Sequence, residues 1–289
     1  MDCTAKKNNL LWPVCLAVGI NQENKSIVLG QAILESEDEF SFRFFLSQLS
    51  TFDSVKFSPG VVFTDECLAE INAVKRVFPD AVDLRCDWHF LKDILKKVAS
   101  MKLSSEVRDG VIESFKKAWY SKTVERFETT MASFMAHLKT LSTSVATALT
   151  TYFDGQMKSK SRWAHCYRSN VLTLMANTTQ RAEGVNGQIG RVCSGSTTFT
   201  TLVVAVENIT VDIEDTTANT DYTRSNRILL DSCGTDLNNR DGVKEIESQC
   251  KDHLSKYAAN MVFNELRRAH LYQVSTSDCH KRFKVSNLQ

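Results

Sequence analysis

The sequence contains few of the features that interrupt helices or cross membranes. Only three of its 289 residues are proline, at Pro13, Pro59 and Pro79. Because proline breaks the interior of an α-helix, its absence after Pro79 allows long helices in the rest of the chain. No apolar run approaches the roughly twenty residues that a membrane span needs. We therefore expect no membrane-spanning segment.

The chain also lacks a strong net charge, since 35 lysines and arginines face 34 acids, which gives +1. This balance argues against a domain held to nucleic acid by bulk electrostatics alone. The charge is uneven, however. Residues 156–191 carry six basic residues and one acid (+5), and residues 211–249 carry nine acids and four basic residues (−5). The pattern predicts either a basic face with an acidic appendage or ordinary solvated helix surfaces.

A disulfide framework is not expected. The nine cysteines show no repeated short spacing, whereas disulfide scaffolds belong to shorter secreted chains. Reduced thiols of a cytosolic or nuclear protein fit the pattern better. The hydrophobic content of 43% and the charged content of 24% are typical of a chain that folds into a globular core.

The first third of the chain alternates between strand and helix patterns. Two apolar runs at 10–20 and 26–34 predict a hairpin, and Phe and Leu at helical spacing follow over 37–49. Residues 59–98 then predict strand, helix, strand and helix, which is a βαβ unit built on parallel strands. Asp65 follows the first of these strands, at the end where α/β folds bind their ligands.

The remainder predicts mainly helices. Apolar residues at steps of three and four over 104–153 indicate a helical hairpin or small bundle, and a further helix is expected over 178–192. Residues 197–209 fit a strand or a helix, and the helix is favoured because Leu202, Val206 and Ile209 fall on one face. Residues 212–241 have loop composition, and a final helix runs from Val243 to about residue 270. The tail from 272 is polar, and we expect no further helix or strand in it. The chain thus divides into an α/β core (1–100), a helical insertion (101–160), a return to the core with an acidic residue (161–210), and an acidic loop, C-terminal helix and tail (211–289).

Three acids are candidates for metal chemistry on nucleic acid. Phosphoryl transfer often uses two Mg²⁺ ions about 3.5–4 Å apart, and hard cations take oxygen ligands. Asp2, Asp65 and Glu183 would serve only if they converge. Each also has a plain alternative: Asp65 as a helix N-cap, Asp2 as a solvated terminal residue, and Glu183 as a surface residue of a helix.

Several motifs resemble the transposase domain of Mutator-like elements. The segment VVFTDECLAEINAVKRVFPDA around Asp65, the following CDWH and the initial DCTAKKN match that family's pattern. Downstream, the segment that begins with Trp163-Ala164 and the segment TTQRAEGVN around Glu183 resemble the part that carries the family's third acid.

The resemblance implies a fold, a site and an activity. The fold is a ribonuclease-H-like mixed sheet of order 3-2-1-4-5 with an all-α insertion and C-terminal helices. Asp2, Asp65 and Glu183 would be the catalytic residues and would hold two Mg²⁺ or Mn²⁺ ions. The activity would be metal-dependent DNA cleavage and strand transfer at element ends and target DNA, by a homo-oligomer in the nucleus.

The chain departs from the family at its start. The family's first acid is preceded by several apolar residues, whereas here it is the second residue, so we expect strand 1 to be largely truncated and the chain to be a fragment or core of a transposase. One alternative is a domesticated, non-catalytic DNA-binding or transcription-regulating protein, resembling the far-red-impaired-response regulators. Another is a nuclease of the ribonuclease-H superfamily without transposition.

Cys86, Trp88 and His89 form a signature beside the predicted site. We expect the signature to organise the strand-to-helix turn next to Asp65, with Trp88 in the core; a buried Cys and a hydrogen-bonded His are the plain alternative. Cys86 and His89 could both bind zinc. A structural zinc site takes four ligands, and no second pair is near in sequence, so we expect no complete zinc site.

Aromatic and basic residues near the third acid are candidates for nucleic-acid contact. Trp163, Arg168 and Arg181 could stack on bases and pair with phosphates. The alternative for Trp163 is an aromatic cluster that fixes the helical insertion onto the sheet.

Overall fold

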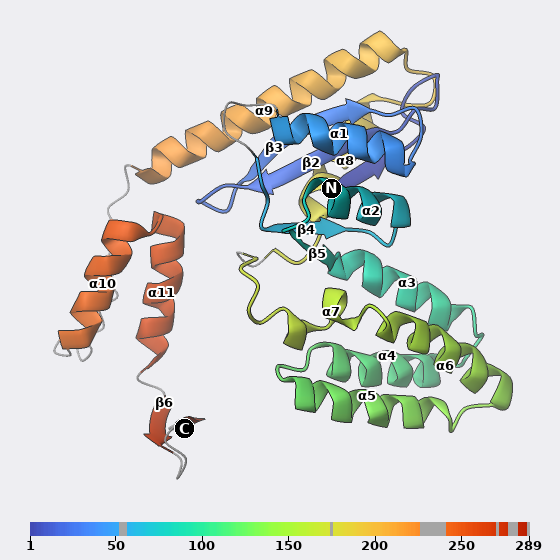
Figure 1. The fold of residues 1–289 in the computed structure, drawn as a ribbon, viewed down its shortest axis with the longest axis vertical. Helices are drawn as coiled ribbons and strands as arrows, with labels where there is room; N and C mark the ends of the chain where they lie inside the picture. The colour runs from blue at the N-terminus through green and yellow to red at the C-terminus, as the bar shows by residue number, and fades with distance from the viewer. Residues whose placement is uncertain (52–56, 174–175, 226–240, 270–271, 277–282, 288–289) are drawn as a thin grey trace. The chain divides into compact units, whose positions relative to one another are not determined.

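The computed structural model describes residues 1–51, 57–173, 176–225, 241–269, 272–276 and 283–287 (Figure 1). The chain splits into two compact units. Unit 1 comprises residues 1–18 and 29–209, and unit 2 comprises residues 19–28 and 210–289. All of the candidate site residues belong to unit 1.

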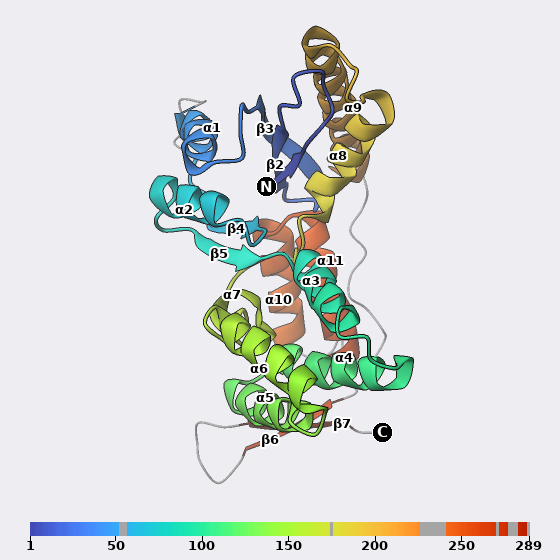
Figure 2. The same cartoon turned by 90° about the vertical axis from the view of Figure 1, so that its right-hand side faces the viewer.

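The chain begins with a three-stranded sheet of order β1-β2-β3, made of β1 (Asp2–Thr4), β2 (Val14–Ile20) and β3 (Ser26–Ile33). β1 is short, as expected, and pairs antiparallel with β2 in the register Asp2↔Leu16 to Thr4↔Val14. Helix α1 (Glu39–Thr51) follows and buries Phe42, Phe45 and Leu46. Figure 2 shows α1 on one side of this sheet and α8 on the other.

The predicted βαβ unit is present. It consists of β4 (Val61–Thr64), α2 (Leu68–Val77) and β5 (Val82–Arg85), and helix α3 (Asp87–Ala99) follows directly. The two strands are parallel, and their register runs from Val61↔Val82 to Thr64↔Arg85. Helix α2 packs beside α1 in one core because its apolar residues recur at helical spacing.

The strands form two separate ladders rather than one five-stranded sheet. The orders 1-2-3 and 4-5 agree with the predicted sequence of strands, but no ladder joins β1 to β4 among the described residues. The residue just before β1 does contact β4, since the Met1 amino group donates to the Phe63 carbonyl oxygen at 3.0 Å. The architecture is therefore mixed α/β, and the continuous order 3-2-1-4-5 is not established by strand pairing.

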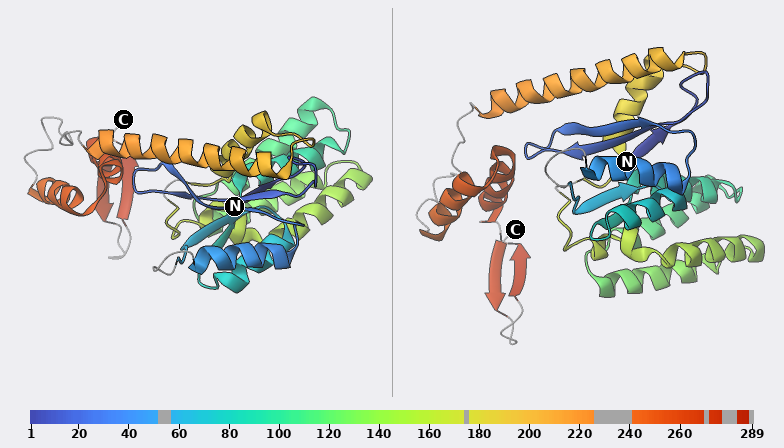
Figure 3. Two further views of the ribbon diagram at one scale, coloured as in Figure 1. Left: turned by 90° about the horizontal axis from the view of Figure 1, so that it is seen from above. Right: turned by 45° about the horizontal axis from the view of Figure 1, so that its top comes forward.

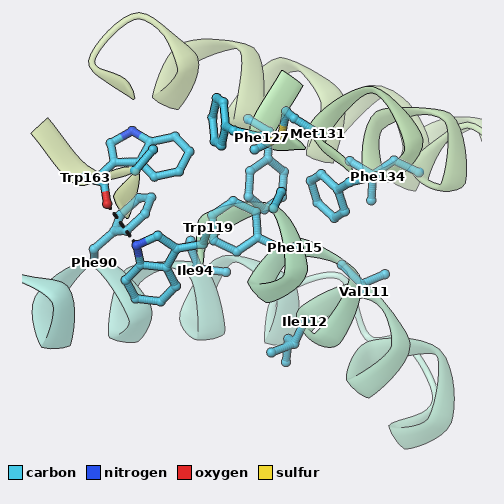
Figure 4. Close-up of a cluster of buried hydrophobic side chains, with 14 of the residues drawn as sticks. Phe90, Ile94, Val111, Ile112, Phe115, Trp119, Phe127, Met131, Phe134 and Trp163 are labelled. Atoms are coloured by element: carbon cyan, nitrogen blue, oxygen red, sulfur yellow. Dashed lines mark hydrogen bonds between the residues drawn. The ribbon is translucent and has the colours of Figure 1, made fainter. Parts of the chain in front are cut away.

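A helical layer follows the second sheet, as the periodicity over 104–153 predicts. Its cluster of buried aromatic rings includes Phe90 of α3, Phe115, Trp119 and Trp163 (Figure 4). Ser104 and Thr123 each accept a backbone N–H of the first turn and so cap the two helices that follow them. The helices of this layer after α3 are α4 (Ser105–Trp119), α5 (Val124–Leu138), α6 (Thr143–Met157) and the short α7 (Lys160–Trp163).

The chain then returns with α8 (Gln180–Val192) and α9 (Phe199–Ser225). The helices predicted over 178–192 and 197–209 are both present. The loop predicted for 212–241 is wrong over 212–225, which continues α9; residues 226–240 lie outside the described residues. Within unit 2, the tip of the β2–β3 hairpin holds this part of α9, since Asn21 Nδ2 donates to Asp221 Oδ2 at 2.8 Å and Thr217 Oγ1 donates to the Ser26 carbonyl at 3.0 Å.

Unit 2 corrects two further predictions. The single C-terminal helix is two helices, α10 (Asp241–His253) and α11 (Lys256–Ala269), because Ser255 accepts the N–H of Ala258 and starts a new helix. The tail, predicted to hold no further element, contains β6 (Tyr272–Thr276) and β7 (Phe283–Asn287), which pair antiparallel. Figure 3 shows α10 and α11 side by side. None of the helices in the described residues is long and apolar enough to cross a bilayer.

Candidate active site

The site lies where the two parallel strands end. Because Thr64 pairs with Arg85, the next residues, Asp65 and Cys86, leave β4 and β5 as neighbours. The Cys86 N–H donates to the Thr64 carbonyl at 3.0 Å and continues the ladder to this point. His89 follows Cys86 by three residues, which is about one turn into α3. Strand register and helix period thus bring Asp65, Cys86 and His89 together.

Asp65 is a partner in an ion pair rather than a helix cap. Helix α2 has Cys67 as its N-cap, so the plain alternative for Asp65 does not hold. The Asp65 carboxylate forms an ion pair with His89 Nδ1. The other ring nitrogen of His89, Nε2, lies 3.7 Å from Glu183 Oε1 on α8. One imidazole therefore lies between two of the three predicted acids.

The negatively charged neighbours of His89 favour the protonated form of its ring. Burial lowers the pKa of His89, but its hydrogen bonds with Asp65 and Cys86 outweigh that effect and raise the pKa to about 10. The ring is therefore protonated at neutral pH and balances the nearby carboxylates. Burial also raises the pKa of the Cys86 thiol, yet hydrogen bonds from His89 and Thr179 bring it below its ordinary value.

Thr179 connects the two sides of the site. It is the N-cap residue of α8, but its side chain makes no capping hydrogen bond. Its hydroxyl lies 3.0 Å from Glu183 Oε1 and 3.3 Å from both Cys86 Sγ and His89 Nδ1, and its backbone N–H donates to the same sulfur at 3.2 Å. Thr179 thus fixes the start of α8, and with it Glu183, against the turn that follows β5.

Asp2 lies on β1 and is held by the same helix that carries Glu183. Its Oδ2 accepts a hydrogen bond of 2.7 Å from Nδ2 of Asn186, one turn beyond Glu183. Burial raises the pKa of Asp2, the bond from Asn186 lowers it, and the charge of Asp65 raises it further. These contacts bring Asp2, Asp65 and Glu183 into one neighbourhood from three separate elements.

The three acids do not form a closed set of ligands. Among the described residues, Asp65, Cys86 and His89 are the group of three whose ligand atoms all lie within 4.8 Å of one another. Three carboxylates without a cation repel each other, and His89 separates two of them here. Motif order predicts that the three acids converge, but it does not predict that the His89 ring lies between Asp65 and Glu183.

Glu70 is a fourth acid that the sequence did not single out. It is buried on α2, and its Oε2 accepts the backbone N–H of Asp65 at 3.3 Å, while Oε1 has no hydrogen-bond partner among the described residues. Burial raises its pKa, the N-terminal ammonium opposes this, and Asp65 adds to it, which gives a pKa of about 8. The sequence does contain a signal for this burial. Glu70 precedes the apolar residues Ala73 and Val74 by three and four positions, which places it on the buried face of α2.

We expect Glu70 to make stability pH-dependent. The pKa of Glu70 in the folded chain, about 8, lies above the ordinary value of 4.5. The contribution of Glu70 to folding stability is therefore fully present below pH 4.5 and is lost as the pH rises to about 8. In urea unfolding from about pH 5 to pH 8, Glu70→Gln should lose less stability than the parent, by on the order of a few kcal/mol. Exposed Glu113→Gln is the control. An unchanged pH slope in Glu70→Gln would show that the carboxyl titrates normally.

The structure corrects the prediction for Trp88. Cys86 is fully buried, and His89 is hydrogen-bonded within the site, but Trp88 is 43% exposed rather than part of the core. Asp87 takes the inward position instead, because Arg168 and His165 bind its carboxylate. The Lys92 ammonium lies 4.4 Å from the centre of the Trp88 ring.

Two of the predicted nucleic-acid contacts point inward. Trp163 is fully buried, and its indole N–H donates to the Gln156 carbonyl. Arg168 Nη1 donates to Asp87 at 2.6 Å, and its Nη2 donates to the carbonyls of Arg85 and Arg162. Both residues therefore fix the helical layer to the sheet, which is the alternative considered for Trp163. Arg181 is partly exposed in the first turn of α8.

Two further arginines complete this attachment of the helical layer. Arg85, at the end of β5, is fully buried and binds Asp93 at 3.0 Å and Gln156 Oε1 at 2.6 Å. Arg162 reaches from α7 to Asp83 of β5 at 2.8 Å. Buried guanidinium groups that bind several acceptors hold a fixed geometry. These arginines therefore fix the helical layer to β5, the strand that ends at the site.

Comparisons with known proteins agree with the motifs. Residues 1–93 match the MULE transposase domain, a stretch that includes Asp2, Asp65 and the Cys86–His89 signature. The chain is also 28% identical over 131 residues to Protein FAR1-RELATED SEQUENCE 5 of Arabidopsis thaliana. The aligned stretch covers 42% of this chain and 16% of that protein. The match thus spans less than a fifth of the relative's length. The resemblance of residues 1–93 to the transposase domain of Mutator-like elements, and of the chain to a FAR1-related protein, is therefore confirmed.

Proposed function

We propose that the chain is the catalytic core of a Mutator-like DDE transposase on a ribonuclease-H-like fold. The observation that carries the proposal is that His89 contacts both Asp65 and Glu183, while Asn186, one turn after Glu183 on α8, donates to Asp2. The strand orders 1-2-3 and 4-5, and the bond from Met1 to Phe63, support the fold. The substrate is DNA, and we infer that the protein works in the nucleus as a homo-oligomer.

The residues present fit a divalent hard cation. All three acids offer carboxylate oxygens, the ligands that Mg²⁺ and Mn²⁺ prefer. The Asp65 Oδ1 atom is buried, and its contact there is the ion pair with His89 Nδ1, which a cation could replace. Asp2, Asp65 and Glu183 would hold the ions, which supply charge stabilisation and an activated oxygen nucleophile for phosphodiester cleavage when bound.

The surrounding residues keep the carboxylates in place. Asn186 orients Asp2, Thr179 orients Glu183, and His89 pairs with Asp65. Each of these contacts restricts an acid that would otherwise rotate away from its neighbours because of charge repulsion. Hydrogen-bonding partners of this kind commonly affect metal affinity or activity about 10–100-fold.

A direct test of metal binding separates the two main candidate functions. Calorimetric titration of the chain with Mn²⁺ should give binding that is lost in Asp65→Asn. The second candidate is a non-catalytic DNA-binding or regulatory protein, which the similarity to a FAR1-related protein favours. Equal Mn²⁺ binding by parent and variant, or none by either, would leave that candidate as the better description.

The exposed face of α3 is our proposed contact for DNA near the site. Trp88, Lys92 and Lys96 recur at steps of four and so lie in one row along the helix, which begins beside His89. We call these three residues the Trp-Lys row. An exposed indole stacks on a nucleobase, and the two lysines can pair with phosphates.

Removing the ring of Trp88 should weaken DNA binding. Loss of one base-stacking contact costs about 1–3 kcal/mol, so Trp88→Ala should bind a short oligonucleotide roughly 5- to 150-fold more weakly in fluorescence anisotropy. Trp88→Phe should recover part of the loss because a smaller ring still stacks. Leu95→Ala removes another exposed side chain of α3 and is the control. Equal affinity for Trp88→Ala and the parent would exclude the row as a contact.

A further inference from the structure

The Asp65, Cys86 and His89 side chains form a second kind of ligand set beside the carboxylates. We call it the Asp-Cys-His cluster. One ligand atom from each residue lies within 4.8 Å of the other two. The parallel register of β4 and β5 supplies two of the residues, and the first turn of α3 supplies the third. Sequence spacing alone shows only Cys86 and His89, because Asp65 joins them through strand pairing.

The donor atoms of this cluster differ in chemistry from the three acids. A sulfur, an imidazole nitrogen and a carboxylate oxygen are ligands of Zn²⁺ and of similar transition metals, whereas Mg²⁺ takes oxygen. Zinc sites with three protein ligands keep a fourth position for water or another ligand. Three ligands therefore make an open zinc site, although they do not make the closed four-ligand site that structural zinc requires.

Contacts around the cluster resemble the outer support of a metal site. The Thr179 N–H donates to Cys86 Sγ at 3.2 Å, and hydrogen bonds to a ligand sulfur are typical of such support. Glu183 Oε1 lies 3.7 Å from His89 Nε2. The Asp65 and His89 side chains are 34% and 20% exposed, so an ion can reach the buried sulfur from their side.

We propose that the Asp-Cys-His cluster binds one transition-metal ion of the Zn²⁺ class, with Asp65, Cys86 and His89 as ligands and one position open. Binding requires no change of covalent structure and only loss of the protons on the ligand atoms, with the His89 ring rotating or shifting to turn a nitrogen to the ion. Asp65 then belongs to two alternative sites. Whatever metal the cluster holds, the proposed Mg²⁺ or Mn²⁺ site cannot use Asp65 at the same time.

Cobalt is a suitable probe because a thiolate bound to Co²⁺ gives a charge-transfer absorption band. Titration of the full chain with Co²⁺, in the presence of a phosphine reductant, should produce this band with saturation at one ion per chain. Zn²⁺ should then abolish the band by displacement, while a large excess of Mg²⁺ should not. Cys86→Ser should eliminate the band, and His89→Gln should weaken Co²⁺ binding by at least about tenfold. Cys193→Ser, a buried cysteine outside the cluster, is the control and should keep the band.

X-ray absorption of the Zn²⁺-loaded parent chain provides a test that needs no variant. The proposal expects one sulfur among nitrogen and oxygen neighbours. A shell of nitrogen and oxygen alone, the absence of a thiolate band with Co²⁺, or a band that persists in Cys86→Ser would overturn it. These results are independent of the proposed transposase activity, since they are read without DNA; a chain that nicks DNA with Mn²⁺ can fail them, and an inactive chain can pass them.

Discussion

Replacing Asp65 with asparagine is expected to lower Mn²⁺-dependent nicking of supercoiled plasmid DNA by at least about 100-fold. The substitution keeps the size of the side chain but removes one anionic oxygen from the centre of the site, where Asp65 pairs with His89 and lies near Asp2. Removing a metal ligand should cost no less than removing one of its supporting contacts, for which losses reach about 100-fold. Quantified conversion of supercoiled to open-circular DNA measures the effect.

Two further variants make this prediction sharper. Asp80→Asn changes an exposed acid before β5, at the opposite end of the strand from the site, and should nick like the parent. The double variant Asp65→Asn with Glu183→Gln should be about as inactive as either single variant, because groups that act as one unit are not additive. Nicking by Asp65→Asn at the parent's rate would remove Asp65 from the catalytic site. Preferential cleavage of RNA–DNA hybrids would instead favour a nuclease without transposition.

Replacing Trp163 with alanine is expected to destabilise the chain by about 3–5 kcal/mol, the usual cost of removing a large aromatic side chain from a core. Trp163 is fully buried, its ring centre lies 4.8 Å from that of Phe90, and its carbonyl accepts the indole N–H of Trp119. At about 2–4 °C per kcal/mol, the melting temperature should fall by roughly 6–20 °C. Differential scanning calorimetry measures this shift.

The same variant decides between the two interpretations of Trp163. Phe40→Ala removes an aromatic side chain that is 76% exposed and should change stability by no more than about 0.5 kcal/mol. If Trp163 is structural, Trp163→Ala should bind DNA normally at temperatures well below its melting point. Unchanged stability together with weakened DNA binding would instead support the nucleic-acid contact that the sequence predicts.

The order of elements in the first hundred residues could be predicted because local patterns and tertiary packing agree there. The strand before Asp65 and the helix after it show their own periods, and Pro79 ends that helix. Pairing between β4 and β1 could not be inferred in the same way. It depends on how a three-residue strand meets its neighbour. Among the described residues, the contact there is the hydrogen bond from Met1, just before β1, to Phe63 of β4.

Trp88 shows why burial on a helix could not be predicted from composition. Where an aromatic residue follows an aspartate on a helix, composition predicts that the ring is buried in the core and that the carboxylate faces the solvent. Here Asp87 is buried because Arg168, 81 residues later in the chain, supplies its counter-charge. Long-range ion pairs of this kind leave no local signal, and Arg168 was for the same reason predicted as a DNA contact.

The C-terminal half of α9 shows tertiary contacts overriding local propensity. Residues 212–225 are rich in Asp, Thr and Asn, which favour loops over helices. Hydrogen bonds from this segment to Asn21 and Ser26 of the β2–β3 hairpin stabilise the helix instead.

The convergence of Asp2, Asp65 and Glu183 on divalent ions is tested most directly by anomalous diffraction from crystals soaked in Mn²⁺. The proposal predicts anomalous peaks at about 2.0–2.6 Å from carboxylate oxygens of all three residues, the range of cation–oxygen distances. Peaks that contact none of the three, or peaks confined to unrelated surface acids, would contradict it.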